Sequence, residues 1–181
     1  MAFKYRVGND GIYYMTITVV EWIDVFTRKE LAAVIVKSLI YCQQKKGLLL
    51  YAWCLMPSHL HLIASAAEGM LLTDIMRDFK KFTSKEVVAT IKEITESRKE
   101  WLLDKFAFAG KVNMKNKDYK FWQDGLHAIE LESNLFLEQK LDYLHRNPVA
   151  SGVVYEPEHY VWSSAINYTG ARGLINVVLI E

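Results

Sequence analysis

The stretch Leu48–Ser65 constrains the fold most, because it holds two strand-like runs joined by a short turn. The runs LLLYAWC and HLHLIAS are apolar, and they flank Leu-Met-Pro-Ser, a connection that suits an antiparallel hairpin. Residues two apart in a strand point to the same face, so His59 and His61 would stand side by side. Leu60 and Leu62 would then face the core. The hairpin therefore predicts a sheet that presents two imidazoles on one face.

The segments around this hairpin predict a further strand and two helices. GIYYMTITVVEW is rich in β-branched and aromatic residues and predicts a first strand. Thr27 and Glu30 have capping-box spacing before an apolar periodic run that ends in lysines and Gly47, which predicts a helix. Thr73 is placed to cap a second helix, whose broken apolar stripe runs through about Glu96.

The last third of the chain predicts a strand, a helix and a final apolar strand. After the strand-like LHAIELE, Ser133 caps a helix that should end near Pro148, because the residue before a proline resists helical geometry. GLINVVLIE is apolar on both faces and predicts a strand buried in a sheet or against a partner. The element order predicts an α+β fold, a ferredoxin-like sandwich with an antiparallel sheet covered by helices on one face. Since no repeat or linker divides residues 1–181, we expect a single domain.

Composition narrows the classes of protein that the chain can form. Apolar residues make up 51% of its 181 residues, enough for a core, but no apolar run approaches the roughly 18 residues of a membrane span. We therefore expect a cytoplasmic protein without a membrane partner. Cys42 and Cys54 lack CxxC spacing and support neither a disulfide framework nor a thiolate zinc site. The net charge of +1 does not decide for or against nucleic acid, because a polarised surface can have a neutral total.

Basic and aromatic residues alternate along the second predicted helix and the segment GKVNMKNKDYKFWQ. This pattern suits single-stranded DNA, with lysines on phosphates and rings on bases, although many such runs are simply solvated loops. The candidate DNA-binding residues are Arg77, Lys80, Lys81, Lys115, Lys117, Lys120 and Trp122.

Tyr143 and Asn147 are four residues apart on the last predicted helix, so they lie one turn apart on one stripe. A tyrosine at such a position is more often a packing residue than a nucleophile, and spacing alone leaves both roles open. His145 should point away from Tyr143, because two residues correspond to about 200° around a helix. We expect it to have a structural or DNA-contacting role. His127 follows a turn and could approach the histidine pair, whereas His159 lies in a loop next to Pro157.

These motifs together resemble the single-tyrosine HUH transposases, particularly the REP-associated tyrosine transposases and their relatives among small insertion sequences. The similar stretches are YYMTITV, WCLMPSHLHLI, IMRDFKKFTSK, FWQDG, LDYLHRNPVASGVV and WSSA. The resemblance implies that His59 and His61 are metal ligands, that Tyr143 is the nucleophile and that Asn147 is the third ligand. Two positions depart from the family pattern. Ser58 stands where many relatives have asparagine, and Asn147 where some have glutamine.

The resemblance also implies a DNA transposase that cuts and rejoins single-stranded, hairpin-containing DNA with a divalent metal, Mg²⁺ or Mn²⁺. An ion held by two neutral imidazoles and an amide oxygen keeps its full charge and open positions for a scissile phosphate. Attack by Tyr143 would give a 5'-phosphotyrosine and a free 3'-hydroxyl, so a second 3'-hydroxyl could later restore the DNA bond. We also expect a homodimer, because related insertion-sequence enzymes are dimers whose tyrosine helix can serve the other subunit. The REP-associated branch can act as monomers, and the sequence alone permits Tyr143 to reach the metal site of its own chain or of a partner.

Two other functions remain as alternatives. A domesticated protein could keep the fold and bind DNA hairpins without cutting them, but the intact set of His59, His61, Tyr143 and Asn147 argues against lost catalysis. A hydrolytic phosphoesterase would use a metal-activated water, and it would need further histidines or carboxylates. No carboxylate has diagnostic spacing with the HLH triplet. Only the tyrosine enzyme would leave protein covalently joined to DNA.

Overall fold

The computed structural model describes residues 11–112 and 118–180. Its helices and strands follow in the order β1 (Tyr13–Thr18), α1 (Lys29–Lys46), β2 (Leu48–Met56), β3 (His59–Ala66), α2 (Leu72–Glu93), α3 (Lys99–Val112), β4 (His127–Glu130) and α4 (Asn134–Ala150). Short 3₁₀ helices form at Val20–Trp22, Val25–Thr27, Pro157–His159 and Ala165–Thr169. In this part of the chain, no helix is long and apolar enough to cross a membrane.

The four strands form one antiparallel sheet in the order β2-β3-β1-β4. This arrangement confirms the predicted α+β, ferredoxin-like fold. The hairpin of β2 and β3 turns at Pro57 and Ser58, as expected. Thr16 in the central strand β1 pairs with His61 on one side and with His127 on the other, so these three residues share one face of the sheet.

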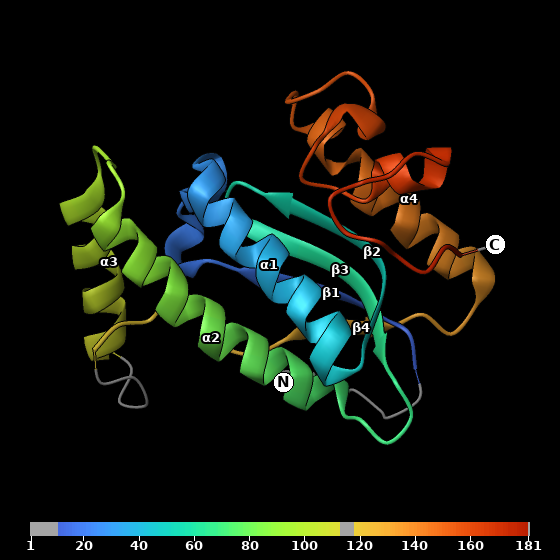
Figure 1. The fold of residues 1–181 in the computed structure, drawn as a ribbon, viewed down its shortest axis with the longest axis horizontal. Coiled ribbons are helices and arrows are strands. Elements are labelled where there is room, and N and C mark those ends of the chain that lie inside the picture. The colour runs from blue at the N-terminus through green and yellow to red at the C-terminus, as the bar shows by residue number, and fades with distance from the viewer. Residues whose placement is uncertain (1–10, 113–117, 181) are drawn as a thin grey trace.

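Helices cover both faces of the sheet, which corrects the expectation of helices on one face. Figure 1 shows α1 and α2 crossing one face together, with α3 beyond one end of α2. Leu60 and Leu62 belong to the core on that face. Ile63 lies on the histidine face and is also fully buried, so that face needs an apolar cover of its own. Leu137 and Leu144 of α4 provide it.

The helix ends agree only in part with the predicted caps. Gly47 ends α1 in the left-handed conformation (φ 73°), and the Ser133 side chain accepts a hydrogen bond from Phe136 N at the start of α4. Thr27 does not cap α1, because its hydroxyl donates to the Asp24 carbonyl and the helix begins at Lys29. Thr73 lies inside α2, which begins one residue earlier.

Three further elements differ from the prediction. Pro148 lies inside α4, which continues to Ala150, because only the last helical turn loses a hydrogen bond there. The sequence did not suggest α3 (Lys99–Val112) as a helix. The final apolar segment is not a strand within the described residues, although the Val178 amide donates to the Leu50 carbonyl of β2.

Candidate active site

His59 and His61 stand side by side at the start of β3. Their ring centroids are 4.6 Å apart, while Leu60 and Leu62 are fully buried on the opposite face. His61 is buried and His59 is half-buried. The strand alternation that the sequence predicted is therefore confirmed, and it produces a pair of imidazoles on one surface.

Hydroxyl groups hold the Nδ1 atoms of both histidines. The Tyr14 hydroxyl lies 2.7 Å and the Thr16 Oγ1 3.0 Å from Nδ1 of His61, and Ser58 Oγ lies 3.1 Å from Nδ1 of His59. When Nδ1–H donates to such an oxygen, Nε2 carries the lone pair that binds a metal. Ser58 thus fills the role of a polar partner for the first histidine.

Burial keeps both imidazoles neutral. It lowers the pKa of His59 below the usual value, and it lowers the pKa of His61 to about 3, with smaller contributions from the charges of His59 and Lys140. A metal-binding imidazole must be unprotonated, so the pair satisfies this requirement at neutral pH. Two neutral imidazoles with engaged Nδ1 atoms fit the donor set of a divalent cation.

Any further protein ligand among the described residues would be a neutral group. Among residues 11–112 and 118–180, no third histidine, cysteine or carboxylate joins the pair in a possible metal-binding group. Asn147, half-buried on α4 one turn beyond Tyr143, offers an amide oxygen. An ion at the pair would draw its other ligands from such an amide, from water or from substrate.

Two tyrosines lie near His61, and their exposure separates their roles. The Tyr143 ring of α4 is 6.1 Å from the His61 ring, and 54% of this residue is exposed. Tyr14 is 6% exposed, its hydroxyl is engaged by His61, and burial raises its pKa to about 12. Tyr143 is therefore the tyrosine of the pair that an external phosphate can reach.

Lys140 is a charged group at this site that the sequence did not single out. Its Nζ lies 5.7 Å from the ring centroid of Tyr143, 5.2 Å from that of Tyr14 and 5.4 Å from that of Phe136. Lys140 precedes Tyr143 by three residues, so both project from one stripe of α4. That spacing is the signal that could have revealed it.

His145 and His127 lie in different settings from the histidine pair. His145 is buried, and its Nε2 lies 2.9 Å from Ser164 Oγ, which accepts a hydrogen bond from Trp53 N. Burial lowers the pKa of His145 to about 4, so this imidazole is neutral. Of the two roles that the sequence left open for it, structural or DNA-contacting, its burial fits the structural one. His127 is exposed on β4, opposite Thr16 and on the same face as His61.

The predicted DNA-binding residues do not form one exposed surface. Trp122 is 5% exposed and its Nε1 donates to Thr83 Oγ1, so this ring is a core residue and the expectation that it stacks on a base is wrong. Lys80 is half-buried, its Nζ donates to the carbonyls of Gln123 and Gly125, and burial lowers its pKa to about 8.

The remaining basic residues have mixed surroundings. Arg77 is exposed but pairs with Asp74 and Asp78, and Lys120 pairs with Asp124 at 2.6 Å. Lys81 is exposed, and it helps to line a cavity of about 430 Å³ together with Lys80 and Lys120. Lys115 and Lys117 lie outside the described residues. Phosphate binding by these groups stays a prediction.

Comparison with known proteins gives two kinds of likeness. A family model described as "Transposase IS200 like" matches residues 10–112. A solved REP-associated tyrosine transposase bound to a REP hairpin aligns with a TM-score of 0.63 and 16% identity, over 100% of this chain and 97% of the other. A crystal structure of an inferred transposase from Deinococcus radiodurans R1 covers 81% of this chain and 94% of its own, with 15% identity and a TM-score of 0.45. None of the curated proteins matches the chain.

Proposed function

The chain belongs to the IS200-like transposase family, and from that premise we propose that it cuts and rejoins single-stranded, hairpin-containing DNA through a covalent bond to Tyr143. The observation that carries this proposal is the placement of Tyr143, which is exposed while its ring lies 6.1 Å from that of His61. The similar REP-associated transposase was solved with a REP hairpin, which supports hairpin DNA as the class of substrate.

His59 and His61 would hold a divalent cation through their Nε2 atoms, and the Asn147 amide oxygen would complete the protein ligands. When bound, Mg²⁺ or Mn²⁺ would supply positive charge that polarises the scissile phosphate. The Tyr14 and Thr16 hydroxyls fix the orientation of the His61 ring, and Ser58 does the same for His59. These contacts order the site before DNA arrives.

In the cleavage step, the Tyr143 oxygen attacks the phosphorus and loses its proton to solvent, which reaches this exposed side chain. The new P–O bond to Tyr143 replaces the bond to the 3'-oxygen, which takes up a proton and leaves as a 3'-hydroxyl. The Lys140 ammonium, close to the Tyr143 ring, attracts the phosphate and offsets its growing charge. Attack by another 3'-hydroxyl reverses these bond changes, restores a DNA phosphodiester and frees Tyr143.

The covalent adduct is the direct test. Hairpin oligonucleotides copied from the DNA flanking its own gene, incubated with the protein and Mn²⁺, should give a protein–DNA adduct that survives denaturing electrophoresis. Tyr143→Phe should abolish the adduct, whereas Tyr155→Phe, at a residue that is 94% exposed, should not. An adduct that persists in Tyr143→Phe would identify another nucleophile. Hairpin binding without any wild-type adduct would favour the binding protein that does not cut.

A second test separates binding from chemistry. His59→Ala and His61→Ala should each lose cleavage and keep most of their DNA affinity, because cation binding serves the transition state while basic residues supply much of the attraction for DNA. Equal losses of affinity and cleavage, in variants that melt like the wild type, would contradict a catalytic role for the pair.

A further inference from the structure

Trp22 is a large aromatic side chain that the protein leaves exposed next to the candidate active site. It is 59% exposed, although tryptophan is highly buried on average. Its ring contacts His59 edge to face, with centroids 5.4 Å apart and an interplanar angle of 71°. Most of the indole is therefore available to a ligand that approaches the histidine pair.

The backbone that carries this ring is strained. Glu21 (φ 53°) and Trp22 (φ 57°) are successive left-handed residues, and they are the non-glycine residues with positive φ in the described chain. Side chains with a Cβ rarely adopt this conformation, and such strain persists only where the surroundings enforce it. Two glycines would have formed the same turn without this cost.

Neighbouring contacts hold the turn in place. The amides of Val19 and Val20 donate to the carbonyls of Ser58 and Phe121, each at 2.9 Å. Ile23 is buried immediately after the turn, and Lys105 Nζ forms an ion pair with Glu21 at 2.8 Å. Because the backbone is anchored on both sides, the indole is held beside His59 on a rigid support rather than on a free loop.

We propose that Trp22 is a stacking platform for a nucleobase of the DNA strand next to the scissile phosphate. The inference rests on the proposed function, since it places that phosphate at His59 and His61. A flat aromatic face can stack on any of the four bases. The T-shaped contact of Trp22 with His59 puts the platform directly beside the phosphate site. Stacking there would fix the strand so that its phosphate meets Tyr143 in a productive position.

The test compares two probes with the same number of phosphates, a short oligothymidylate and an abasic strand of equal length. The wild type should bind oligothymidylate more tightly. Trp22→Ala should weaken that binding by on the order of tenfold and leave abasic binding unchanged, because stacking is lost while phosphate contacts remain. Trp22→Phe keeps an aromatic face and should retain most of the preference.

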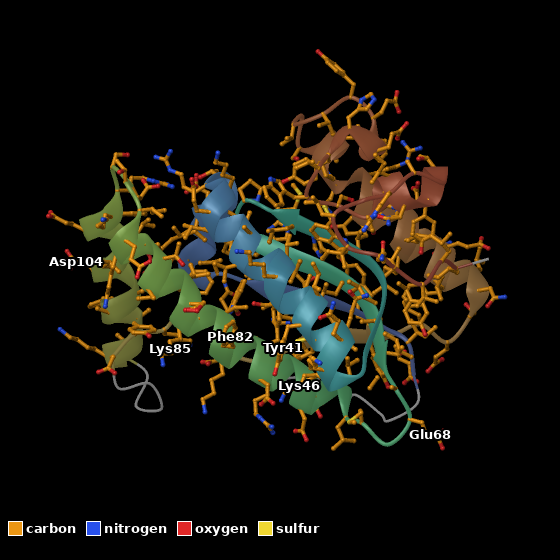
Figure 2. All side chains as sticks on the ribbon, viewed as in Figure 1. Tyr41, Lys46, Glu68, Phe82, Lys85 and Asp104 are labelled. Atoms are coloured by element: carbon orange, nitrogen blue, oxygen red, sulfur yellow. The ribbon has the colours of Figure 1, made fainter. Side chains whose placement is uncertain are left out.

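Phe82→Ala is the matched control. Phe82 is 56% exposed and projects from α2, in the helix layer over the opposite face of the sheet (Figure 2), so its loss should change neither affinity. If Trp22→Ala does not fold, Trp22→Gly replaces it, because glycine adopts the left-handed backbone freely. A folded variant of either kind that keeps the full preference for oligothymidylate overturns the platform.

The same measurements separate this inference from the proposed function. A wild type that forms no adduct but prefers oligothymidylate through Trp22 would overturn the chemistry and support the platform. A Trp22→Ala variant that forms the adduct and keeps the full base preference would overturn the platform alone.

Discussion

Replacing Tyr14 by phenylalanine should weaken cation binding at the candidate site without reshaping it. The substitution keeps the buried ring, whose centroid lies 5.6 Å from that of His61, and removes only the hydroxyl 2.7 Å from Nδ1. Thr16 Oγ1, 3.0 Å from the same nitrogen, can still accept the Nδ1–H hydrogen bond. The ring of His61 should therefore keep its orientation but lose the shorter of its two contacts.

The expected loss of Mn²⁺ affinity follows from these two contacts. Loss of the outer hydrogen-bond partner of a metal-binding histidine usually costs about 10- to 100-fold in affinity or activity. Because Thr16 compensates in part, Tyr14→Phe should fall near the lower end, at about tenfold, or about 1.4 kcal/mol. Tyr14→Phe combined with Thr16→Val removes both acceptors and should approach about 100-fold.

The assay is the Mn²⁺ concentration that gives half of the maximal rate of adduct formation. Both variants should need more Mn²⁺ and recover most of the wild-type rate at saturation. Tyr51→Phe, which removes a hydroxyl 3.1 Å from Ser65 Oγ outside the site, should behave like the wild type. If the double variant is folded and its Mn²⁺ requirement is unchanged, then the hydrogen bonds to Nδ1 of His61 do not support metal binding, and the assignment of His61 Nε2 as a metal ligand is wrong.

Three further outcomes are expected. Lys140→Gln should slow adduct formation on the order of tenfold, measured at saturating DNA, since it removes positive charge near the Tyr143 ring. The Arg28 hydrogen bond lowers the pKa of Glu96 to about 2 from its ordinary 4.5. The ionised Glu96 therefore stabilises the fold fully above pH 4.5, and this stabilisation is lost as the pH falls toward 2. The urea midpoint of unfolding should therefore fall as the pH is lowered toward 2 in the wild type, and it should fall less in Glu96→Gln. A mixture of His61→Ala and Tyr143→Phe chains should form no adduct, and recovered cleavage would mean that subunits share sites.

The parts of the fold that the sequence predicted depend on short-range patterns. The alternation His59, Leu60, His61 fixed which face carries imidazoles, because one step along a strand reverses the side. Gly47 and Ser133 marked helix ends through backbone conformation and a local side-chain hydrogen bond. Each of these signals lies within a few residues of the feature that it specifies.

The errors at Trp122 and Tyr14 concern contacts between distant segments. Trp122 stands among lysines and so resembled an exposed ring, but its bridge with Val19 and its bond to Thr83 place it in the core. α3 was missed although Leu102 and Phe106, both buried, have helical spacing. The sequence predicted only a strand position for Tyr14, because its contact with His61 joins residues 47 positions apart. Such pairings follow from sheet register, which a local pattern does not reveal.

The short connection before α4 determines whether Tyr143 reaches the candidate active site of its own chain or that of a partner. β4 pairs with β1 and ends at Glu130, and α4 begins at Asn134. Those four steps span at most about 14 Å when extended. Leu137 and Leu144 of α4 are 7% and 0% exposed against the sheet, and each such burial contributes roughly 1.5–3 kcal/mol. A tyrosine helix that left for a partner would lose these contacts, so each chain should cut with its own Tyr143 even if the predicted homodimer forms.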